Sequence, residues 1–266
     1  MEDSQMNIMM IGDIYGQPGR RTAAHYIPLL RGKYNLDLII ANGENSAGGV
    51  GITAKVLKEL LEMGIDCVTT GNHVWDKKEV FDFIDTENNL IRPANYPPGT
   101  PGKGYHILSI KNRRIAIINL LGRVFMPPID CPFRTVNQIL SEIKDTCEII
   151  VIDFHAEATS EKLALGYYLD GQVSCIAGTH THIQTADERI FPQGTAYISD
   201  IGMVGSLHSI LGVDREPVIK KFLTGLPTKF TVATGCETIF CAVMITIDPY
   251  SNQVIHITRI QEYFQF

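Results

Sequence analysis

Carboxylate, amide and imidazole side chains follow five apolar runs of this sequence, each within a few residues of the point where the run ends. They are Asp13 after 6–11, Glu44 and Asn45 after 36–41, Asn72 and His73 after 65–70, His155 after 148–154, and His180 and His182 after 173–177. The carboxyl ends of neighbouring parallel strands face one crevice, where ligands bind. We therefore expect these side chains, although far apart in sequence, to lie close together.

The types of these side chains indicate a metal centre. Carboxylates, amides and imidazoles without a thiolate suit divalent first-row metals such as Mn, Fe, Co, Ni or Zn. The absence of cysteine from the set argues against a structural zinc site. Because the set offers more donors than one tetrahedral ion needs, the sequence predicts two ions that share a bridging carboxylate.

The segment from Gly178 to His182 allows a check of distances. If its backbone is extended, His180 and His182 project to the same face, roughly 6.5–7 Å apart. That separation suits one histidine per metal for ions about 3.5–4 Å apart. On its own the pair also fits a surface strand with two solvated histidines, but the donors after the other runs favour metal binding.

Two further histidines are candidates for contacts with a substrate. Asn72 and His73 are adjacent, so their side chains diverge, and Asn72 can bind metal through its amide oxygen while His73 faces the substrate. In the alternative interpretation Asn72 caps a turn and His73 packs beneath Trp75. His208, in a glycine-rich loop, is a candidate for substrate binding in the pocket, with a structural role as the alternative. Structural roles are expected for the remaining histidines, which are His25, His106 and His256.

Composition and charge narrow the class of protein. The chain has 266 residues, of which 45% are hydrophobic, enough for a sizeable core. No apolar run reaches the roughly 18 residues of a membrane span, and the acidic start of the chain lacks the features of an export signal. The six cysteines form no Cys-x-x-Cys pair, which favours free thiols in the cytoplasm.

The charge pattern bears on partners. The net charge is −6, and the basic residues are scattered, which argues against a basic patch for nucleic acid. A small molecule is therefore the expected partner, and positive charge for a phosphate ligand must come largely from bound cations. The oligomeric state stays open, a homo-oligomer included.

The apolar runs and the segments between them predict one α/β domain over residues 1–266. Strand-like runs alternate with helix-like segments in the first two thirds, as in βαβ units with a largely parallel sheet. Helices are expected over 53–63, which Gly64 ends, over Lys77–Ile84 after the capping-box spacing of Asp76 and Glu79, and over 160–169. Strand-like runs at 195–199, 228–233, 238–247 and 253–260 predict antiparallel strands that complete a second sheet or layer.

Several short motifs resemble those of a known family. Gly12-Asp13, Gly71-Asn72-His73, a lone His155 after a strand and 178–182 resemble, in this order, the motifs of the calcineurin-like metallophosphoesterases. More narrowly, five segments look like those of the bacterial YmdB-type phosphodiesterases. They are Gly12-Asp-Ile-Tyr-Gly16, Asn42-Gly-Glu-Asn-Ser-Ala-Gly-Gly49, Gly71-Asn-His-Val-Trp-Asp76, 153–161 and 179–187. The resemblance covers essentially the whole chain.

The resemblance implies a four-layer α/β/β/α sandwich of two mixed sheets flanked by helices. It also implies two divalent first-row metal ions, iron or manganese, and hydrolysis of cyclic nucleotides, with 2′,3′-cyclic nucleotides as substrates, by a hydroxide that bridges the ions. The sequence departs from the superfamily at Tyr15, where the first motif has histidine, and at Glu44, where the bridging carboxylate is usually aspartate. Both departures are typical of the YmdB-type subgroup, and Asn45 is the substitute donor for the missing histidine.

With that resemblance, a specific hypothesis for the reaction follows. One metal is assigned to Asp13, Glu44, Asn45 and His182, and the other to Glu44, Asn72, His155 and His180. Glu44 bridges the ions, and His73 protonates or stabilises the leaving ribose oxygen, a role that contributes roughly 10²–10⁴-fold. Two alternatives stay open: a nucleotidase, phosphomonoesterase or phosphoprotein phosphatase on the same fold, and a non-catalytic metal-binding regulatory protein.

Overall fold

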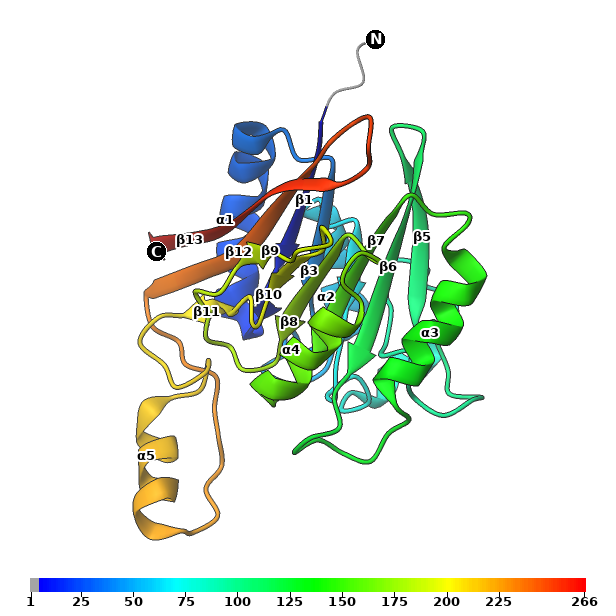
Figure 1. The fold of residues 1–266 in the computed structure, drawn as a ribbon. Coiled ribbons are helices and arrows are strands. Elements are labelled where there is room, and N and C mark those ends of the chain that lie inside the picture. Colours follow the sequence, from blue (N-terminus) through cyan, green and yellow to red (C-terminus); the bar gives the residue numbers. More distant parts are fainter. Residues whose placement is uncertain (1–4) are drawn as a thin grey trace.

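The computed structural model describes residues 5–266, which form two β-sheets that pack face to face. Helices cover the outer face of each sheet, so the layers follow the order α/β/β/α (Figure 1). The architecture implied by the family resemblance is therefore confirmed.

The two sheets differ in strand order. The first has the order β2-β11-β12-β1-β3-β4, with β13 paired to β12, and the second has the order β5-β6-β7-β8-β10-β9. The strands of the first sheet are β1 (Met6–Ile11), β2 (Asp13–Ile14), β3 (Leu38–Asn42), β4 (Cys67–Thr69), β11 (Met203–Ser206), β12 (Glu237–Ile247) and β13 (Val254–Gln265). Those of the second are β5 (Tyr105–Ile110), β6 (Arg113–Leu121), β7 (Ile149–His155), β8 (Cys175–Thr179), β9 (Arg189–Ile190) and β10 (Ala196–Ile198).

Alternating side chains of the strands fill separate cores. In β1, Met6, Ile8 and Met10 point into the core between the sheets, whereas Met9 and Ile11 pack under α1 (Gly16–Tyr34) and α2 (Ala54–Glu62). On the far side, α3 (Pro132–Ile143) and α4 (Thr159–Tyr168) cover the second sheet. Because both faces of the central strands are buried, these strands are continuous apolar runs in the sequence.

The helices predicted over 53–63 and 160–169 are confirmed as α2 and α4. The prediction of a helix over Lys77–Ile84 is wrong, because this segment contains only the short 3-10 helix η1 (Lys78–Asp82). Both side chains of the expected capping box bond elsewhere. Glu79 Oε1 accepts a hydrogen bond from the backbone N–H of Ala54 (2.8 Å), and Asp76 pairs with His73.

Two of the antiparallel strands predicted in the last third are confirmed as β12 and β13, but they extend the first sheet and do not complete a second sheet or layer. β12 lies antiparallel to β1 inside the first sheet, because its alternate residues are apolar on both faces, and β13 pairs along its other edge. The run 195–199 becomes β10, parallel to β8 in the second sheet. The run 228–233 forms only an isolated bridge, between Val213 and Val232, because no strand lies beside it.

Residues 207–236, here called the arm, leave the first sheet between β11 and β12. The arm contains α5 (Arg215–Thr224), which projects away from both sheets in Figure 1. Phe222 on α5 is 85% exposed, and the neighbouring Leu223 is exposed to a similar degree. Within the arm, Gly212 packs against Tyr15, directly after β2, and Val232 packs against Gly49 in the loop that follows β3.

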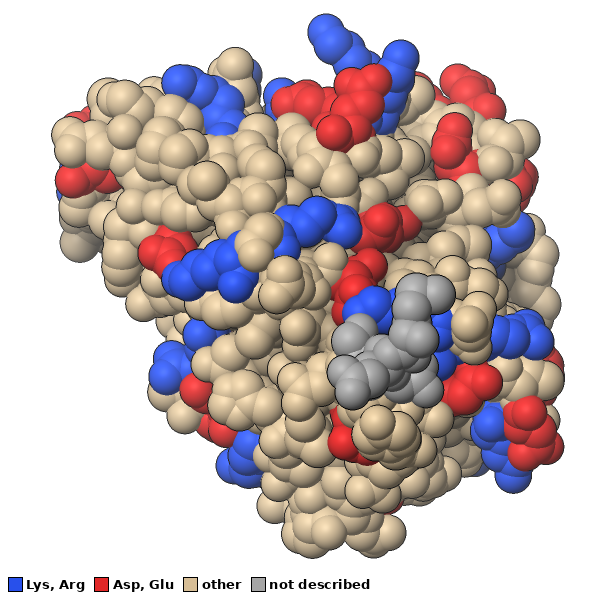
Figure 2. Space-filling view, turned by 90° about the horizontal axis from the view of Figure 1, so that it is seen from above, with Lys and Arg blue, Asp and Glu red and all other residues tan. Residues whose placement is uncertain are grey.

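Three further features of the structure concern the cysteines, the surface charges and the lengths of the helices. All six cysteines are free. On the face seen in Figure 2, Lys and Arg side chains lie interspersed with Asp and Glu side chains. Within residues 5–266, no helix has the length and apolar character needed to cross a membrane.

Candidate functional site

The side chains singled out by the sequence meet where the two sheets adjoin. The first sheet supplies Asp13 at the start of β2, Glu44 and Asn45 after β3, and Asn72 after β4. The second sheet supplies His155 at the end of β7 and His180 and His182 after β8. The parallel strands of both sheets end at the same edge, so residues as distant in sequence as Asp13 and His182 come together there, as the sequence predicts.

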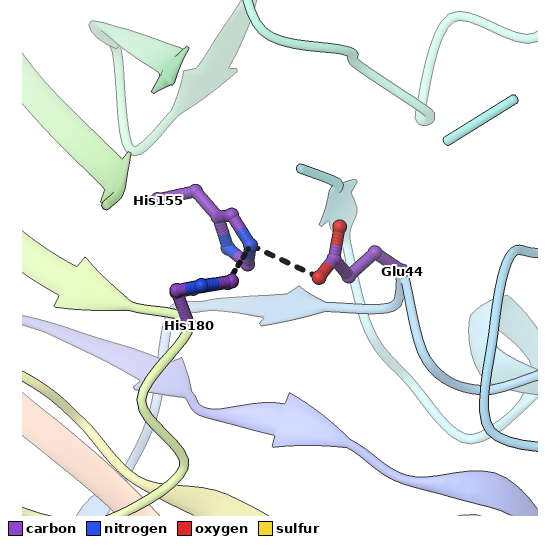
Figure 3. A group of neighbouring side chains, drawn as sticks. All are labelled: Glu44, His155 and His180. Carbon is purple, nitrogen blue, oxygen red and sulfur yellow. Dashed lines mark hydrogen bonds and ion pairs between the residues drawn. The ribbon is translucent and has the colours of Figure 1, made fainter. Parts of the chain in front are cut away.

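One group of donors surrounds His155. Its Nε2 lies 2.9 Å from Glu44 Oε1, 3.0 Å from His180 Nδ1 and 3.1 Å from Asn72 Oδ1. In Figure 3 the His155 imidazole, at the end of β7, points at the Glu44 carboxylate, and the His180 imidazole, just after β8, lies against His155. Ligand atoms of Glu44, His155 and His180 all lie within 4.8 Å of one another, so one cation can reach all three.

A second group of donors surrounds Asn45. Its amide Nδ2 lies 3.3 Å from Asp13 Oδ1, Glu44 Oε1 and His182 Nε2. Asn45 would bind a cation through Oδ1, which a half-turn of the amide brings to the position of Nδ2. The two groups share Glu44, whose Oε1 is within 3.3 Å of a member of each.

The space around the donors fits bound cations. A Cβ atom at Gly71 would overlap with the His155 imidazole and lie 2.5 Å from Glu44 Oε2, so glycine keeps this side of the cluster open. The donors are oxygens and imidazole nitrogens, the types that divalent first-row metals accept. The residues present therefore fit two metal ions, one beside each group, with Glu44 between them.

Charges in the cluster oppose the cost of burial. Burial disfavours ionisation of Asp13 and Glu44, yet His182 lowers the pKa of Asp13 and His155 lowers the pKa of Glu44. Burial also disfavours the charged form of His155, but Glu44 raises the pKa of this imidazole to about 9. Burial and the neighbouring His155 lower the pKa of His180 to about 4. A cation that binds His155 must displace its proton, because imidazole binds metal in the neutral form.

The second nitrogen of each histidine is held by a protein oxygen. Thr179 Oγ1 donates to Asp153 Oδ1 (2.7 Å) and therefore accepts from the Nδ1–H of His155 (2.9 Å). The Leu211 carbonyl accepts from the Nδ1–H of His182 (2.9 Å), and Glu157 lies 3.2 Å from His180 Nε2. Such partners fix the tautomer, so the remaining nitrogen lone pair faces the cluster.

Buried polar residues that the sequence did not single out support this arrangement. Asn42 Oδ1 accepts from the backbone N–H of Glu44 (3.1 Å), and Asn42 Nδ2 donates to Asp153 (3.2 Å). Burial raises the pKa of Asp153 to about 6, although its hydrogen bonds from Thr179 and Thr69 favour the carboxylate. Asp153 lies inside the apolar run 148–154, and Asn42 directly follows 36–41, so a polar residue in or beside such a run is the signal that could have indicated them.

The backbone that carries His180 and His182 is bent, so the expectation of an extended segment is wrong. β8 ends at Thr179, and both histidines have positive φ, 99° and 63°. Positive φ in non-glycine residues is strained and needs support from the surroundings. Asp200 Oδ2 provides that support by accepting from the backbone N–H of Thr181 (3.0 Å) and from Lys162 Nζ (2.7 Å).

His73 lies beside the cluster without joining either donor group. Its backbone N–H donates to Glu44 Oε2 (3.0 Å), and its Nδ1 lies 2.7 Å from Asp76 Oδ2. The Nε2 atom has no hydrogen-bond partner within residues 5–266. His73 lines a cavity of about 480 Å³ that also contacts Glu44, His180 and His182.

His208 does not line this cavity, so the expectation of a pocket residue is wrong. Its Nε2 lies 2.6 Å from Glu237 Oε2, and both side chains are exposed. His208 lies at the start of the arm, and Leu211 and Val213, a few residues later, line the cavity instead.

Comparison with known proteins agrees with this geometry. A family model described as YmdB-like protein matches residues 9–260. A 2′,3′-cyclic-nucleotide 2′-phosphodiesterase of Bacillus subtilis (strain 168) is 52% identical over 255 residues, 96% of each chain. A solved hypothetical protein of Thermus thermophilus is 41% identical with a TM-score of 0.92, covering 97% of this chain and 100% of its own. A solved phosphatase of Mycoplasma pneumoniae is 33% identical with a TM-score of 0.93, covering 98% and 95%.

The motifs, the four-layer fold and these similarities agree along essentially the whole chain. This protein belongs to the YmdB-like family of calcineurin-like metallophosphoesterases.

Proposed function

We propose that this protein is a binuclear metal-dependent phosphodiesterase that opens 2′,3′-cyclic nucleotides. The observation that carries the proposal is the shared position of Glu44, which contacts both donor groups at the wall of one cavity. The 52% identical Bacillus subtilis relative is named for this reaction and supports the choice of substrate. A cytoplasmic location is part of the same proposal.

Two divalent ions, iron or manganese, would occupy the two groups. Asp13, Glu44, Asn45 and His182 would hold one ion, and Glu44, Asn72, His155 and His180 would hold the other. When bound, such ions lower the pKa of a water molecule from 15.7 towards about 7 and neutralise charge on the phosphoryl oxygens. The protein contributes fixed donors, so little reorganisation accompanies the reaction.

His73 would assist the leaving oxygen. Asp76 holds Nδ1 of the imidazole, which leaves Nε2 free at the cavity for contact with the substrate. The hydrogen bond from the His73 backbone to Glu44 fixes the distance between this imidazole and the metal donors. Transfer of a proton from His73 Nε2 to the departing 2′ oxygen would accompany cleavage of the bond between that oxygen and phosphorus. The phosphate would then remain on the 3′ oxygen.

Elemental analysis and a substrate panel test the proposal. Freshly purified protein should contain close to two equivalents of iron or manganese, and it should hydrolyse 2′,3′-cyclic AMP faster than 3′,5′-cyclic AMP or adenosine 3′-monophosphate. Faster release of phosphate from the monoester would identify a phosphomonoesterase or nucleotidase instead. Full metal content without hydrolysis of any member of the panel would identify a non-catalytic metal-binding protein.

A further inference from the structure

The proposed chemistry uses only one side of the cavity. The opposite side is formed by the arm, whose lining residues are Leu211, Val213, Phe230, Thr231 and Val232. Phe230 is 43% exposed, and Lys221 Nζ lies 5.0 Å from the centre of its ring. The cavity wall therefore presents an aromatic ring that a flat ligand can cover, and one face of that ring is accompanied by a cation.

Tyr15 lies where the arm side and the metal side of the cavity meet. Its ring contacts the His182 imidazole edge-on, with 5.5 Å between the ring centres, and Gly212 packs directly on it. The residue is only 9% exposed, yet its hydroxyl has no hydrogen-bond partner among the described residues 5–266. This hydroxyl is not one of the fully buried unpaired polar atoms, so it reaches solvent. Because Tyr15 lines the cavity, this donor is available to a ligand there.

The loop after β3 completes this part of the cavity. Gly48, Gly49 and Val50 all line it. A Cβ atom at Gly49 would lie 3.0 Å from both Tyr15 Oη and Val232 Cγ2, so the loop and the arm are in close contact. Tyr15 and Phe230 thus line an extension of the cavity that contains the metal donors.

We propose that this extension is the subsite for the nucleoside part of the substrate. Phe230 packs against the base, and Tyr15 Oη donates a hydrogen bond to an oxygen of the ribose phosphate. The inference rests on the proposed function, because a phosphodiester at the metal donors places its nucleoside in the remaining cavity. Aromatic rings are effective platforms for bases, since every base has a π face.

The scarcity of polar side chains on the arm side of the cavity indicates that the subsite accepts all four bases. Among the lining residues of the arm, only Thr231 has a polar side chain, and its Oγ1 already donates to Asp214 (2.7 Å). No side chain of the arm that lines the cavity therefore has a free hydrogen-bond donor with which to select a base stacked on Phe230. We expect purine nucleotides to bind better than pyrimidine nucleotides because their larger rings cover more of Phe230.

Steady-state kinetics with two substrates test the subsite. The substrates are 2′,3′-cyclic AMP and methyl β-D-riboside 2′,3′-cyclic phosphate, which lacks a base. Phe230→Ala should raise KM for the nucleotide roughly tenfold with little change in kcat, and leave both constants unchanged for the base-free compound. Tyr15→Phe should lower kcat/KM about fivefold for both substrates, at unchanged metal content, because it removes one hydrogen bond to the part they share.

Phe222→Ala is the matched control, because Phe222 is a more exposed phenylalanine of the same arm that does not line the cavity. It should change neither substrate's constants. An equal loss for both substrates in Phe230→Ala, or an unchanged KM for the nucleotide, would overturn the base contact. Unchanged kinetics in Tyr15→Phe would overturn the hydroxyl contact.

Binding of the product separates failure of the subsite from failure of the proposed function. Calorimetry of adenosine 3′-monophosphate and ribose 3-phosphate needs no turnover. If the protein hydrolyses neither cyclic substrate, the proposed reaction is wrong, but a roughly tenfold weaker binding of the nucleotide alone in Phe230→Ala still supports the subsite. Equal nucleotide binding by the protein and by Phe230→Ala would exclude it.

Discussion

The two sides of the cavity are built in opposite ways. On the strand-end side, Asp13, Glu44 and His155 are at most 1% exposed, and each has hydrogen-bond or ion-pair partners from other strands. On the arm side, Leu211 and Phe230 are more than 40% exposed and belong to a segment that lies outside both sheets. One side holds its groups in fixed geometry, and the other presents apolar surface with few constraints.

The difference separates two tasks that an enzyme of this class must combine. Metal donors must keep their distances to within a fraction of an ångström, and buried, fully bonded strand ends provide that rigidity. A surface that accepts several bases needs contact area rather than fixed polar partners. Substitutions on the strand-end side should therefore cause large losses for every substrate, whereas substitutions on the arm side should cause small or substrate-dependent ones.

Glu44→Gln should have the largest effect, because the shared donor of both groups loses its charge. Gln keeps the shape of the side chain but cannot balance two cations or the protonated His155 beside it. The loss of metal affinity should exceed the roughly 10–100-fold that removal of an outer partner of a metal ligand causes. Elemental analysis and diesterase assays measure this effect. Glu62→Gln, on the exposed face of α2, is the control, and two fully occupied metal sites in Glu44→Gln would refute the shared role.

His73→Ala should separate chemistry from metal binding on the same side of the cavity. The variant removes the imidazole but keeps the backbone N–H that donates to Glu44, so metal content should stay unchanged. Turnover should fall by about 10²–10⁴-fold, the usual contribution of a general acid. His256→Ala, at an exposed position of β13, should leave turnover unaffected. Full activity of His73→Ala with both metals present would remove His73 from the reaction.

Much of the strand-end side could be predicted from the sequence, because two simple regularities define it. A buried parallel strand is an apolar run, and the first polar residues after such a run lie at the edge where the strands end. These rules indicate Asp13, Glu44, His155 and the other donors without any knowledge of strand order. They do not indicate Asp153, which lies inside β7, because the direction of a polar side chain inside a strand depends on its neighbours in the sheet. They also do not show that Asn42, directly after 36–41, turns to Asp153.

The arm side and the local bends could not be predicted in this way. Phe230 lies in a run that resembles a strand, but only the presence of a neighbouring strand would make it one, and none lies beside the arm. The positive φ of His180 and His182 depends on Lys162 and Asp200, whose positions follow from the tertiary fold. Local sequence patterns thus predict which side chains a segment buries. The course of the arm and the bend at His180 and His182 depend instead on contacts that exist only in the assembled fold.

Asp153→Asn tests whether the rigidity of the strand-end side extends beyond the donors. Asp153 holds Thr179, which in turn fixes Nδ1 of His155, and Asn would let this hydroxyl turn away. Metal affinity should fall roughly 10–100-fold while the protein stays folded. Competition with a chelator of known affinity measures the change, with the exposed Asp145→Asn as control. Equal affinity in both variants would mean that the His155 tautomer needs no such support.

The smallest effect is expected on the arm, where Phe222→Ala should change the free energy of unfolding by less than about 0.5 kcal/mol, as exposed substitutions usually do. Phe154→Ala is the matched substitution in the core between the second sheet and its helices, and it should cost about 3–5 kcal/mol. Urea denaturation at two protein concentrations measures both. A concentration-dependent loss of more than about 1 kcal/mol in Phe222→Ala would show that another copy covers α5, because only an intermolecular contact makes stability depend on concentration. The contrast between a rigid side and an unconstrained side of the cavity would then describe the isolated chain but not the assembled protein.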